Sequence, residues 1–218
     1  MMRKVMSNRV SILNNDLVNM ASLVEKQIYD SMIALKEQDL ILADKIIDND
    51  DKVDDMHKEI EEKCIKFMAT ESPLAKDLRR IYTTSKIVTD LERMADHAVD
   101  ICKIVNRLDG VNFVDEISPI WRMGDIIIEM IKLSIEAYVS GDVDAAYEIC
   151  HMDDSVDEIH QGMFETVLKK MAKDETAINQ GTQILFISKY IERIGDHVTN
   201  ICEWIIFSKK GTYVDLNE

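Results

Sequence analysis

The sequence predicts an all-α fold made of two tandem three-helix bundles, with six long helices packed antiparallel. Only seven of the 218 residues are Gly and two are Pro, whereas 46% are hydrophobic. This composition favours long uninterrupted helices over a β structure with many turns. The chain also repeats itself at an offset near 100 residues, and short connections between long helices make consecutive helices neighbours.

The repeat is visible in two pairs of stretches. Residues 39–57 align with 142–160 without a gap, and eight of these 19 positions are identical. Further along, residues 91–102 match 191–202 at six of 12 positions. The shared residues of the first pair include two aspartates and a histidine per copy: Asp50, Asp54 and His57, then Asp153, Asp157 and His160.

The offset falls from 103 to 100 between these matches, so the first half carries three extra residues near Thr70–Pro73. Insertions of this kind belong in loops. A period near 100 residues is too long for a solenoid repeat and indicates two copies of a small domain. We therefore expect one domain at residues 1–109 and another at residues 110–218.

Three helices are expected in the first copy, near residues 10–36, 40–69 and 72–110. The third begins with Ser72 as its cap and Pro73 in its first turn, a pairing that is favoured at helix starts. Polar residues separate the first helix from the second.

The second copy repeats this pattern with helices near residues 118–140, 142–172 and 175–209. Pro119 lies in the first turn of the first of these helices, and Gly141 directly follows its end. Helices of this length with short connections pack antiparallel, which gives a three-helix bundle for each copy.

The third helix of each copy has an apolar line at helical spacing. Its members in the first copy are Ile87, Leu91, Met94, Ala98, Ile101 and Val105, and in the second copy Ile187, Ile191, Ile194, Val198, Ile201 and Ile205. The second helices have similar stripes, but Asp50 and His57 interrupt the first stripe. Asp153 and His160 interrupt the other. Because polar side chains are unfavourable in a stripe that faces the core, these residues are candidates for a functional site.

A carboxylate motif with acids at i and i+4 lies on the flank of each apolar line: Glu92 and Asp96, then Glu192 and Asp196. On a helix this spacing places the two acids about 5–6 Å apart, where they repel each other unless a positive charge intervenes. The residue before each aspartate is small, Ala95 or Gly195, which leaves room for a close approach.

Each copy thus has four acids on two helices, and they form the candidate metal ligands: Asp50, Asp54, Glu92 and Asp96, then Asp153, Asp157, Glu192 and Asp196. A buried ionised carboxylate costs several kcal/mol unless it is paired or bound to metal. Four carboxylates form a hard oxygen set that suits Fe, Mn, Mg or Ca. The sequence leaves open whether each site is built within one copy or shared between copies.

Salt bridges are an alternative to metal. Arg93 and Arg193 lie inside the motifs and could neutralise the acids directly. His57 and His160 each follow an aspartate by three residues, which permits imidazole ligation or orientation of a ligand from a second layer.

Three further polar residues are expected near the acids. His97 and His197 come directly after the motif aspartates and point about 100° away from them around the helix, so a structural or hydrogen-bonding role is expected. Asp100 is replaced by Asn200 in the second copy, which could make the two sites unequal.

The charge balance excludes some function classes. With 26 basic and 41 acidic residues the formal net charge is −15, which disfavours nucleic acids and anionic membrane surfaces as partners. The sequence has no apolar run of membrane-spanning length, and its start lacks a run of signal-peptide length. The four cysteines are widely spaced and read as reduced core residues. We expect a cytoplasmic protein.

With these motifs in view, the chain resembles the PhoU family, regulators of bacterial phosphate transport. The resemblance rests on "ERMADHAVDI" and "ERIGDHVTNI", together with the upstream "DDKVDDMH" and "DDSVDEIH", and covers almost the whole chain as two repeats. It implies two bundles related by a pseudo-twofold, a homodimer or larger oligomer, and multinuclear iron clusters held by the acidic motifs.

The resemblance also implies a cytoplasmic adaptor that represses the phosphate-starvation response when phosphate is plentiful. Its expected partners are the ATPase of the high-affinity phosphate ABC transporter and the membrane histidine kinase that senses phosphate. A non-enzymatic role agrees with the sequence, which has no Gly-rich phosphate loop and no nucleophile placed beside a base.

Two other functions stay open. The chain could be a PhoU-like accessory protein of a low-affinity phosphate transporter. It could also be a carboxylate-bridged di-iron oxidoreductase, because carboxylate and histidine ligands on bundle helices occur in ferritin-like enzymes as well. Those enzymes need Glu-x-x-His on two helices of one four-helix bundle, whereas this chain has Asp-x-x-His once in each repeat.

Overall fold

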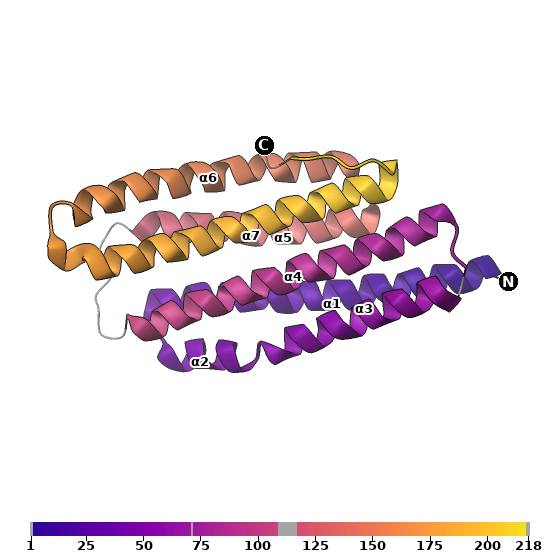
Figure 1. The fold of residues 1–218 in the computed structure, drawn as a ribbon, viewed down its shortest axis with the longest axis horizontal. Helices are drawn as coiled ribbons and strands as arrows, with labels where there is room; N and C mark the ends of the chain where they lie inside the picture. The colour runs from indigo at the N-terminus through magenta and orange to yellow at the C-terminus, as the bar shows by residue number, and fades with distance from the viewer. Residues whose placement is uncertain (1, 71, 109–116, 217–218) are drawn as a thin grey trace.

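The computed structural model describes residues 2–70, 72–108 and 117–216, with side chains from Asn8 onward. Almost all of these residues are helical, and no strand occurs among them. The helices form two layers of long antiparallel rods (Figure 1). The all-α fold class predicted from the sequence is confirmed.

The first half of the chain forms one layer of three rods. Its helices are α1 (Met2–Glu37), α2 (Leu40–Asp48), α3 (Asp51–Thr70) and α4 (Ala75–Arg107). The rod that follows α1 consists of α2 and α3, arranged end to end (Figure 1). α4 then returns alongside both α1 and α3.

The second half forms the other layer. Its elements are α5 (Ser118–Ser140), α6 (Val143–Met171), the short 3₁₀ helix η2 (Glu175–Ala177) and α7 (Ile178–Lys210). The two layers meet mainly where α4 packs against α7, and α1 also packs against α5. The two helices that carry the Glu-x-x-x-Asp motifs therefore lie against each other.

The predicted single helix at residues 40–69 is wrong in one respect, because it is interrupted at Asn49 and Asp50. The interruption falls in the run Asp48-Asn49-Asp50-Asp51, whose side chains compete with the backbone for hydrogen bonds and have low helix propensity. The side-chain amide of Asn49 indeed donates to the Lys45 carbonyl. α6 continues unbroken through the equivalent stretch, so Asp50 lies in a turn while Asp153 lies inside a helix.

The predicted start of the third helix is also wrong. α4 begins at Ala75, its N-cap is Leu74, and no side chain caps it. Ser72 instead has a positive φ of 44° and belongs to the turn after α3. The first half is longer than the second here, and its additional backbone is taken up before the helix starts.

Other helix ends follow the sequence signals. Gly141 ends α5 in the left-handed conformation, with φ of 69°, which a residue without Cβ adopts at no steric penalty. Asp142 then caps α6, because its carboxylate accepts from the backbone N–H groups of Asp144 and Ala145. Pro119 lies in the first turn of α5, as expected.

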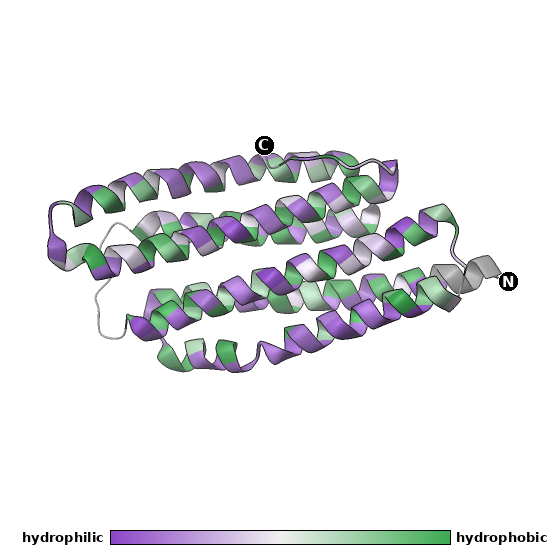
Figure 2. Ribbon diagram, viewed as in Figure 1, coloured by the Kyte–Doolittle hydropathy of each residue, from purple (hydrophilic) through white to green (hydrophobic). Residues whose placement is uncertain are grey.

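The core lies between and within the layers. Both apolar lines predicted for the third helices are buried along their whole length. Hydrophobic and hydrophilic residues alternate along every helix, as an amphipathic bundle requires (Figure 2). Cys64, Cys102 and Cys202 are buried, Cys150 is half-buried, and all four are free thiols.

No helix in the described ranges is long and apolar enough to cross a membrane. The predicted boundary between residues 109 and 110 falls in the stretch 109–116, outside the described residues.

Candidate functional site

The four acids of the first half come together where the α2–α3 turn and α3 face α4. Burial raises the pKa of Asp50 above its ordinary value, and the charges of Asp96 and Asp54 raise it further. Burial likewise raises the pKa of Glu92, followed by the effect of Asp96. We call this group, Asp50, Asp54, Glu92 and Asp96, the first cluster.

A neutral and a charged donor stabilise the carboxylates of the first cluster. Gln27 on α1 donates from Nε2 to Asp50 Oδ1 at 3.1 Å. Arg93 donates from Nη1 to Asp96 Oδ2 at 2.9 Å, and its Nε lies 3.4 Å from Glu92 Oε2. The salt bridges considered from the sequence are therefore present in the structure.

The second cluster consists of Asp153, Asp157, Glu192 and Asp196, which lie between α6 and α7. Asp157 is exposed and Asp196 is half-buried. Partial loss of water contact raises the pKa of each, and the charge of Glu192 adds to the effect. The acids of each cluster thus act on one another within one half of the chain.

Asp153 is the most buried of the eight acids, with 8% of its surface exposed. Its Oδ2 accepts a hydrogen bond from Thr199 Oγ1 at 3.1 Å, whereas its Oδ1 is buried without a hydrogen-bond partner among the described residues. Burial first, and then the charge of Asp157, raise the pKa of Asp153 to about 7. Binding of a cation or a proton would stabilise a carboxylate in these surroundings.

Gly195 explains how Asp153 reaches this position. A Cβ at residue 195 would lie 2.2 Å from Asp153 Oδ1, which is closer than non-bonded atoms approach. The small residue predicted to allow a close approach therefore accommodates an acid of the protein itself. In the first half this position is Ala95.

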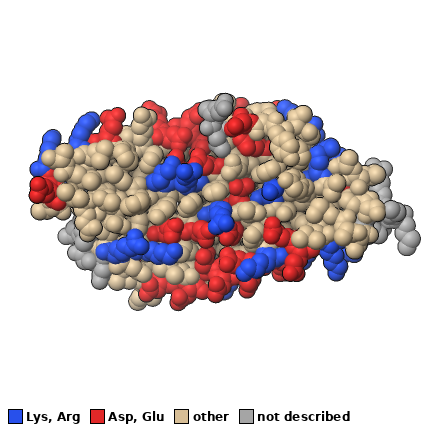
Figure 3. Space-filling view, in the orientation of Figure 1, with Lys and Arg blue, Asp and Glu red and all other residues tan. Residues whose placement is uncertain are grey.

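Two basic side chains lie in the second cluster. Lys189 Nζ is 2.6 Å from Glu192 Oε1 and 2.5 Å from Glu192 Oε2. Arg193 Nη1 is 3.3 Å from Asp196 Oδ2. Figure 3 shows acidic side chains gathered over the middle of the molecule, with basic side chains set among them.

The histidines of the second helices lie beside the clusters. His57 Nε2 is 3.7 Å from Glu61 Oε1. A positive charge on His57 lowers the pKa of Glu92. His160 Nδ1 is hydrogen-bonded to Ser188 Oγ at 2.7 Å, and burial lowers the pKa of His160. The latter contact orients the His160 ring.

The two histidines that follow the motif aspartates meet where α4 packs against α7. Their rings are 5.8 Å apart, and the His97 ring stacks on Tyr190. His197 Nδ1 is hydrogen-bonded to Asp90 Oδ1 at 2.9 Å. Asp100 Oδ1 accepts a hydrogen bond from Lys103 Nζ at 2.9 Å, and the charge of Lys103 lowers the pKa of Asp50.

The donor sets suit a hard metal ion, although their side chains do not enclose one as they stand. No three His, Cys, Asp or Glu side chains in the described ranges are placed together as ligands for one ion. The acids nevertheless share a neighbourhood, and Asp153 presents a buried carboxylate oxygen without a hydrogen bond. Side-chain rotation of the acids would be required to bind metal, and the metal assignment stays a prediction.

The sequence analysis did not identify three residues that donate to the acids, Gln27, Lys189 and Thr199, or Asp90, which is hydrogen-bonded to His197. Lys189 precedes Glu192 by three residues, a spacing that places both on one helix face and could have revealed the pair. Gln27 and Asp90 lie 23 and 107 residues from their partners, so no local spacing signals those contacts.

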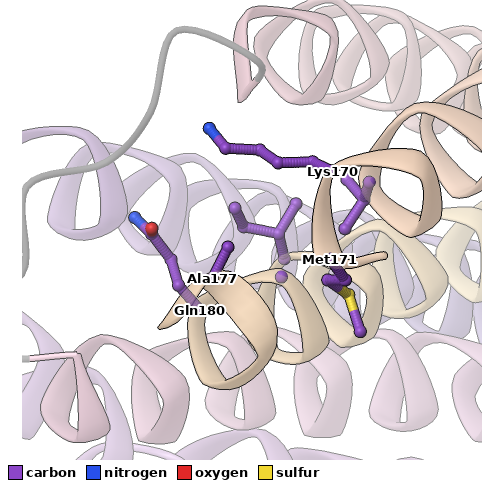
Figure 4. Close-up of a pocket in the computed structure, with 7 residues that line it drawn as sticks. Lys170, Met171, Ala177 and Gln180 are labelled. Atoms are coloured by element: carbon purple, nitrogen blue, oxygen red, sulfur yellow. The ribbon is translucent and has the colours of Figure 1, made fainter. Parts of the chain in front are cut away.

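A cavity between α6 and α7 lies away from this chemistry. It is lined by Val167, Lys170, Met171, Ala177, Gln180, Gly181 and Ile184 (Figure 4). Its volume of about 10 Å³ has room for one water molecule at most. It therefore does not suit an organic ligand.

The sequence matches a known family along most of its length. The PhoU domain model matches residues 17–105 and 120–205. A phosphate-specific transport system accessory protein PhoU homolog from Clostridium acetobutylicum is 49% identical over 219 residues, covering 100% of both chains. The phosphate-specific transport system accessory protein PhoU of Escherichia coli is 31% identical, covering 91% of this chain and 83% of that protein.

Solved structures of the family have the same fold. PhoU from Pseudomonas aeruginosa superposes with a TM-score of 0.90 at 30% identity, covering 94% of this chain and 99% of that chain. The phosphate transport system regulatory protein PhoU from Streptococcus pneumoniae also gives a TM-score of 0.90, at 27% identity, covering 96% of this chain and 99% of that chain. The repeated acidic motifs, the helical fold and these matches agree, and the chain belongs to the PhoU family.

Proposed function

We propose that this protein is an accessory regulator of phosphate transport that works in the cytoplasm and represses the phosphate-starvation response when phosphate is plentiful. The observation that carries the proposal is the full-length match to a relative named as a phosphate-specific transport accessory protein. The partners we propose are the ATPase of the phosphate ABC transporter and the phosphate-sensing histidine kinase. The protein acts on them by contact, as a homodimer, and not by catalysis.

Metal binding is part of the proposal. The eight cluster acids would hold hard cations, with multinuclear iron preferred and Mn or Mg as alternatives. Bound cations supply positive charge that relieves the repulsion among four carboxylates and ties two helices of one layer together. The buried, unpartnered Oδ1 of Asp153 supports this assignment for the second cluster.

The regulatory role is tested with a reporter driven by a phosphate-starvation promoter. Deletion of the gene should leave the reporter on in phosphate-rich medium, and complementation should silence it. If the deletion strain stays silent, the regulatory assignment is wrong, and an accessory role beside a low-affinity transporter becomes the better explanation.

The contact mechanism is tested by pull-down of the transporter ATPase and the kinase with the purified protein.

Elemental analysis of protein prepared without chelator should show bound metal in the parent. The metal should be lost in the variant with four substitutions: Glu92→Ala, Asp96→Ala, Glu192→Ala and Asp196→Ala. Equal metal content in both proteins would remove the metal part of the proposal while leaving the partner contacts to stand on the pull-down.

A further inference from the structure

The two clusters contain equivalent acids but different cations. Arg93 in the first cluster has its counterpart in Arg193, since each pairs with the motif aspartate three residues later. Lys189 has no such counterpart, because the equivalent residue of the first copy is Thr89. The first copy in turn has Lys103 beside its cluster, where the second copy has Glu203. The two clusters therefore receive positive charge from different positions.

Lys189 lies within the second cluster and not merely near it. Its Nζ contacts both carboxylate oxygens of Glu192, whose side chain is only 13% exposed. The ammonium group of Lys189 therefore lies where a cation bound to Glu192 would lie.

The first cluster has no lysine in this position. Lys58 Nζ lies 4.0 Å from Asp54 Oδ2, and its side chain is 67% exposed, so water screens this pair strongly. Glu92, the counterpart of Glu192, has Arg93 Nε at 3.4 Å, and His57 is also near enough to act on it. Lys103 acts on Asp50 of the first cluster, but it does not form an ion pair with Glu92 as Lys189 does with Glu192.

We propose that Lys189 is a tethered cation that competes with metal ions for the second cluster and lowers the metal affinity of that cluster. The inference rests on the proposed metal binding and names the residue that regulates it. A divalent ion that binds Glu192 must first displace the ammonium. The lysine is able to leave, because 41% of its side chain is exposed and its stem is flexible.

Asp153 gives the second cluster a binding group that Lys189 does not neutralise. Its carboxylate is buried, and no donor in the described part of the chain reaches Oδ1. Removal of the lysine should therefore leave a site with an unsatisfied carboxylate and a freed Glu192. Since Thr already occupies the equivalent position of the first repeat, Lys189→Thr is the natural exchange, and Thr89→Lys is its reciprocal.

The experiment is titration of the chelator-treated protein with Mn²⁺, with free Mn²⁺ followed by electron paramagnetic resonance. Lys189→Thr should tighten binding at one class of sites by about tenfold, the effect expected for removing one partly screened positive charge. Thr89→Lys should weaken the other class. Lys189→Gln provides a second test that preserves helix propensity better than Thr.

Two controls separate this effect from net charge and from misfolding. Lys169→Thr removes a lysine that pairs with Glu165 on the exposed surface of α6, and it should leave Mn²⁺ affinity unchanged. Lys189→Arg retains the charge and should bind Mn²⁺ like the parent. Circular dichroism confirms the helical content of each variant.

The outcomes distinguish the inference from the function on which it rests. If the parent and Lys189→Gln bind Mn²⁺ equally well, the role of Lys189 is wrong although the metal site stands. If neither the parent nor any Lys189 variant binds Mn²⁺, the metal proposal itself is overturned, and the competition with it.

Discussion

At the scale of single residues, Asp153 shows how burial changes an acid. Its folded-state pKa of about 7 lies above the ordinary value of 3.8, so the folded protein holds a proton there that the unfolded chain releases. For an acid shifted in this direction, stability is greatest below the unfolded pKa and falls as pH rises through the folded pKa. Metal-free protein should therefore lose stability between about pH 4 and 7 because of this residue.

Asp153→Asn removes the charge while retaining the shape of the side chain. We expect the metal-free variant to be more stable than the parent near pH 8, by about 1–3 kcal/mol, and to differ less near pH 4. Denaturant unfolding at both pH values measures the difference. Parallel pH profiles for the two proteins would show that Asp153 is not desolvated as the structure indicates.

Gly195 is coupled to Asp153 by direct contact. Gly195→Ala should destabilise the metal-free protein by about 1–3 kcal/mol, because the new methyl group displaces the Asp153 carboxylate from its hydrogen bond with Thr199. A double-mutant cycle with Asp153→Ala should show a smaller penalty when the carboxylate is absent. Additive free energies of unfolding would contradict the contact, and Ala95→Gly in the first repeat is the matched control.

At the scale of helices, the ends and interruptions decide where the acids lie. The polar run at residues 48–51 divides the second rod of the first layer, whereas α6 crosses the equivalent stretch unbroken. Asp50 therefore sits in a turn, within reach of Gln27 on α1, and Asp153 sits on a continuous helix that faces α7. Equivalent acids thus acquire different surroundings.

A pair of glycine substitutions tests the role of the helix end. Gly141→Ala should destabilise the protein by about 1 kcal/mol, because the C-cap has a positive φ that Ala adopts only with strain. Gly162→Ala lies within α6, where a new Cβ meets no atom within 4 Å, and should stabilise by about 0.5–1 kcal/mol. Thermal unfolding measures the change in stability of each variant. If both substitutions change the stability in the same direction, the role assigned to Gly141 at the helix end is wrong.

At the scale of the whole molecule, the acids of both layers add to a net charge of −15. The two motif-bearing helices pack against each other, and the His197–Asp90 hydrogen bond joins the layers between the clusters. Repulsion within each cluster opposes folding, and protein cations offset only part of it. Screening by salt and specific binding of metal should therefore both stabilise the fold.

We expect the melting temperature of metal-free protein to rise with NaCl concentration, and to rise further with Mn²⁺ at constant ionic strength. The variant with alanine at Glu92, Asp96, Glu192 and Asp196 should lose the response to Mn²⁺. The control variant removes four exposed acids on other surfaces: Asp125, Glu129, Glu136 and Glu165. If this control loses the Mn²⁺ response equally, the effect belongs to net charge and not to the clusters.

The helical fold class, the duplication and the buried lines of α4 and α7 could be predicted from the sequence, because all three depend on periodicity along the chain. The sequence also identified the end of α5 at Gly141, since that signal is local. The predicted cap at Ser72 and the unbroken helix at residues 40–69 were wrong. In both places the chain forms a turn although the sequence pattern favours a helix. The pattern alone does not give the relative stability of the turn and the helix.

The helices that share each group of acids, and the donors that reach them, became known from the packing of the helices. Gln27 reaches Asp50 from another helix, and Asp153 is held against Gly195 by the packing of α6 on α7. Such contacts join residues that are distant in the chain, so the spacing of residues along the sequence does not predict them. The burial that raises the pKa of Asp153 has the same origin, because desolvation depends on every neighbouring element at once.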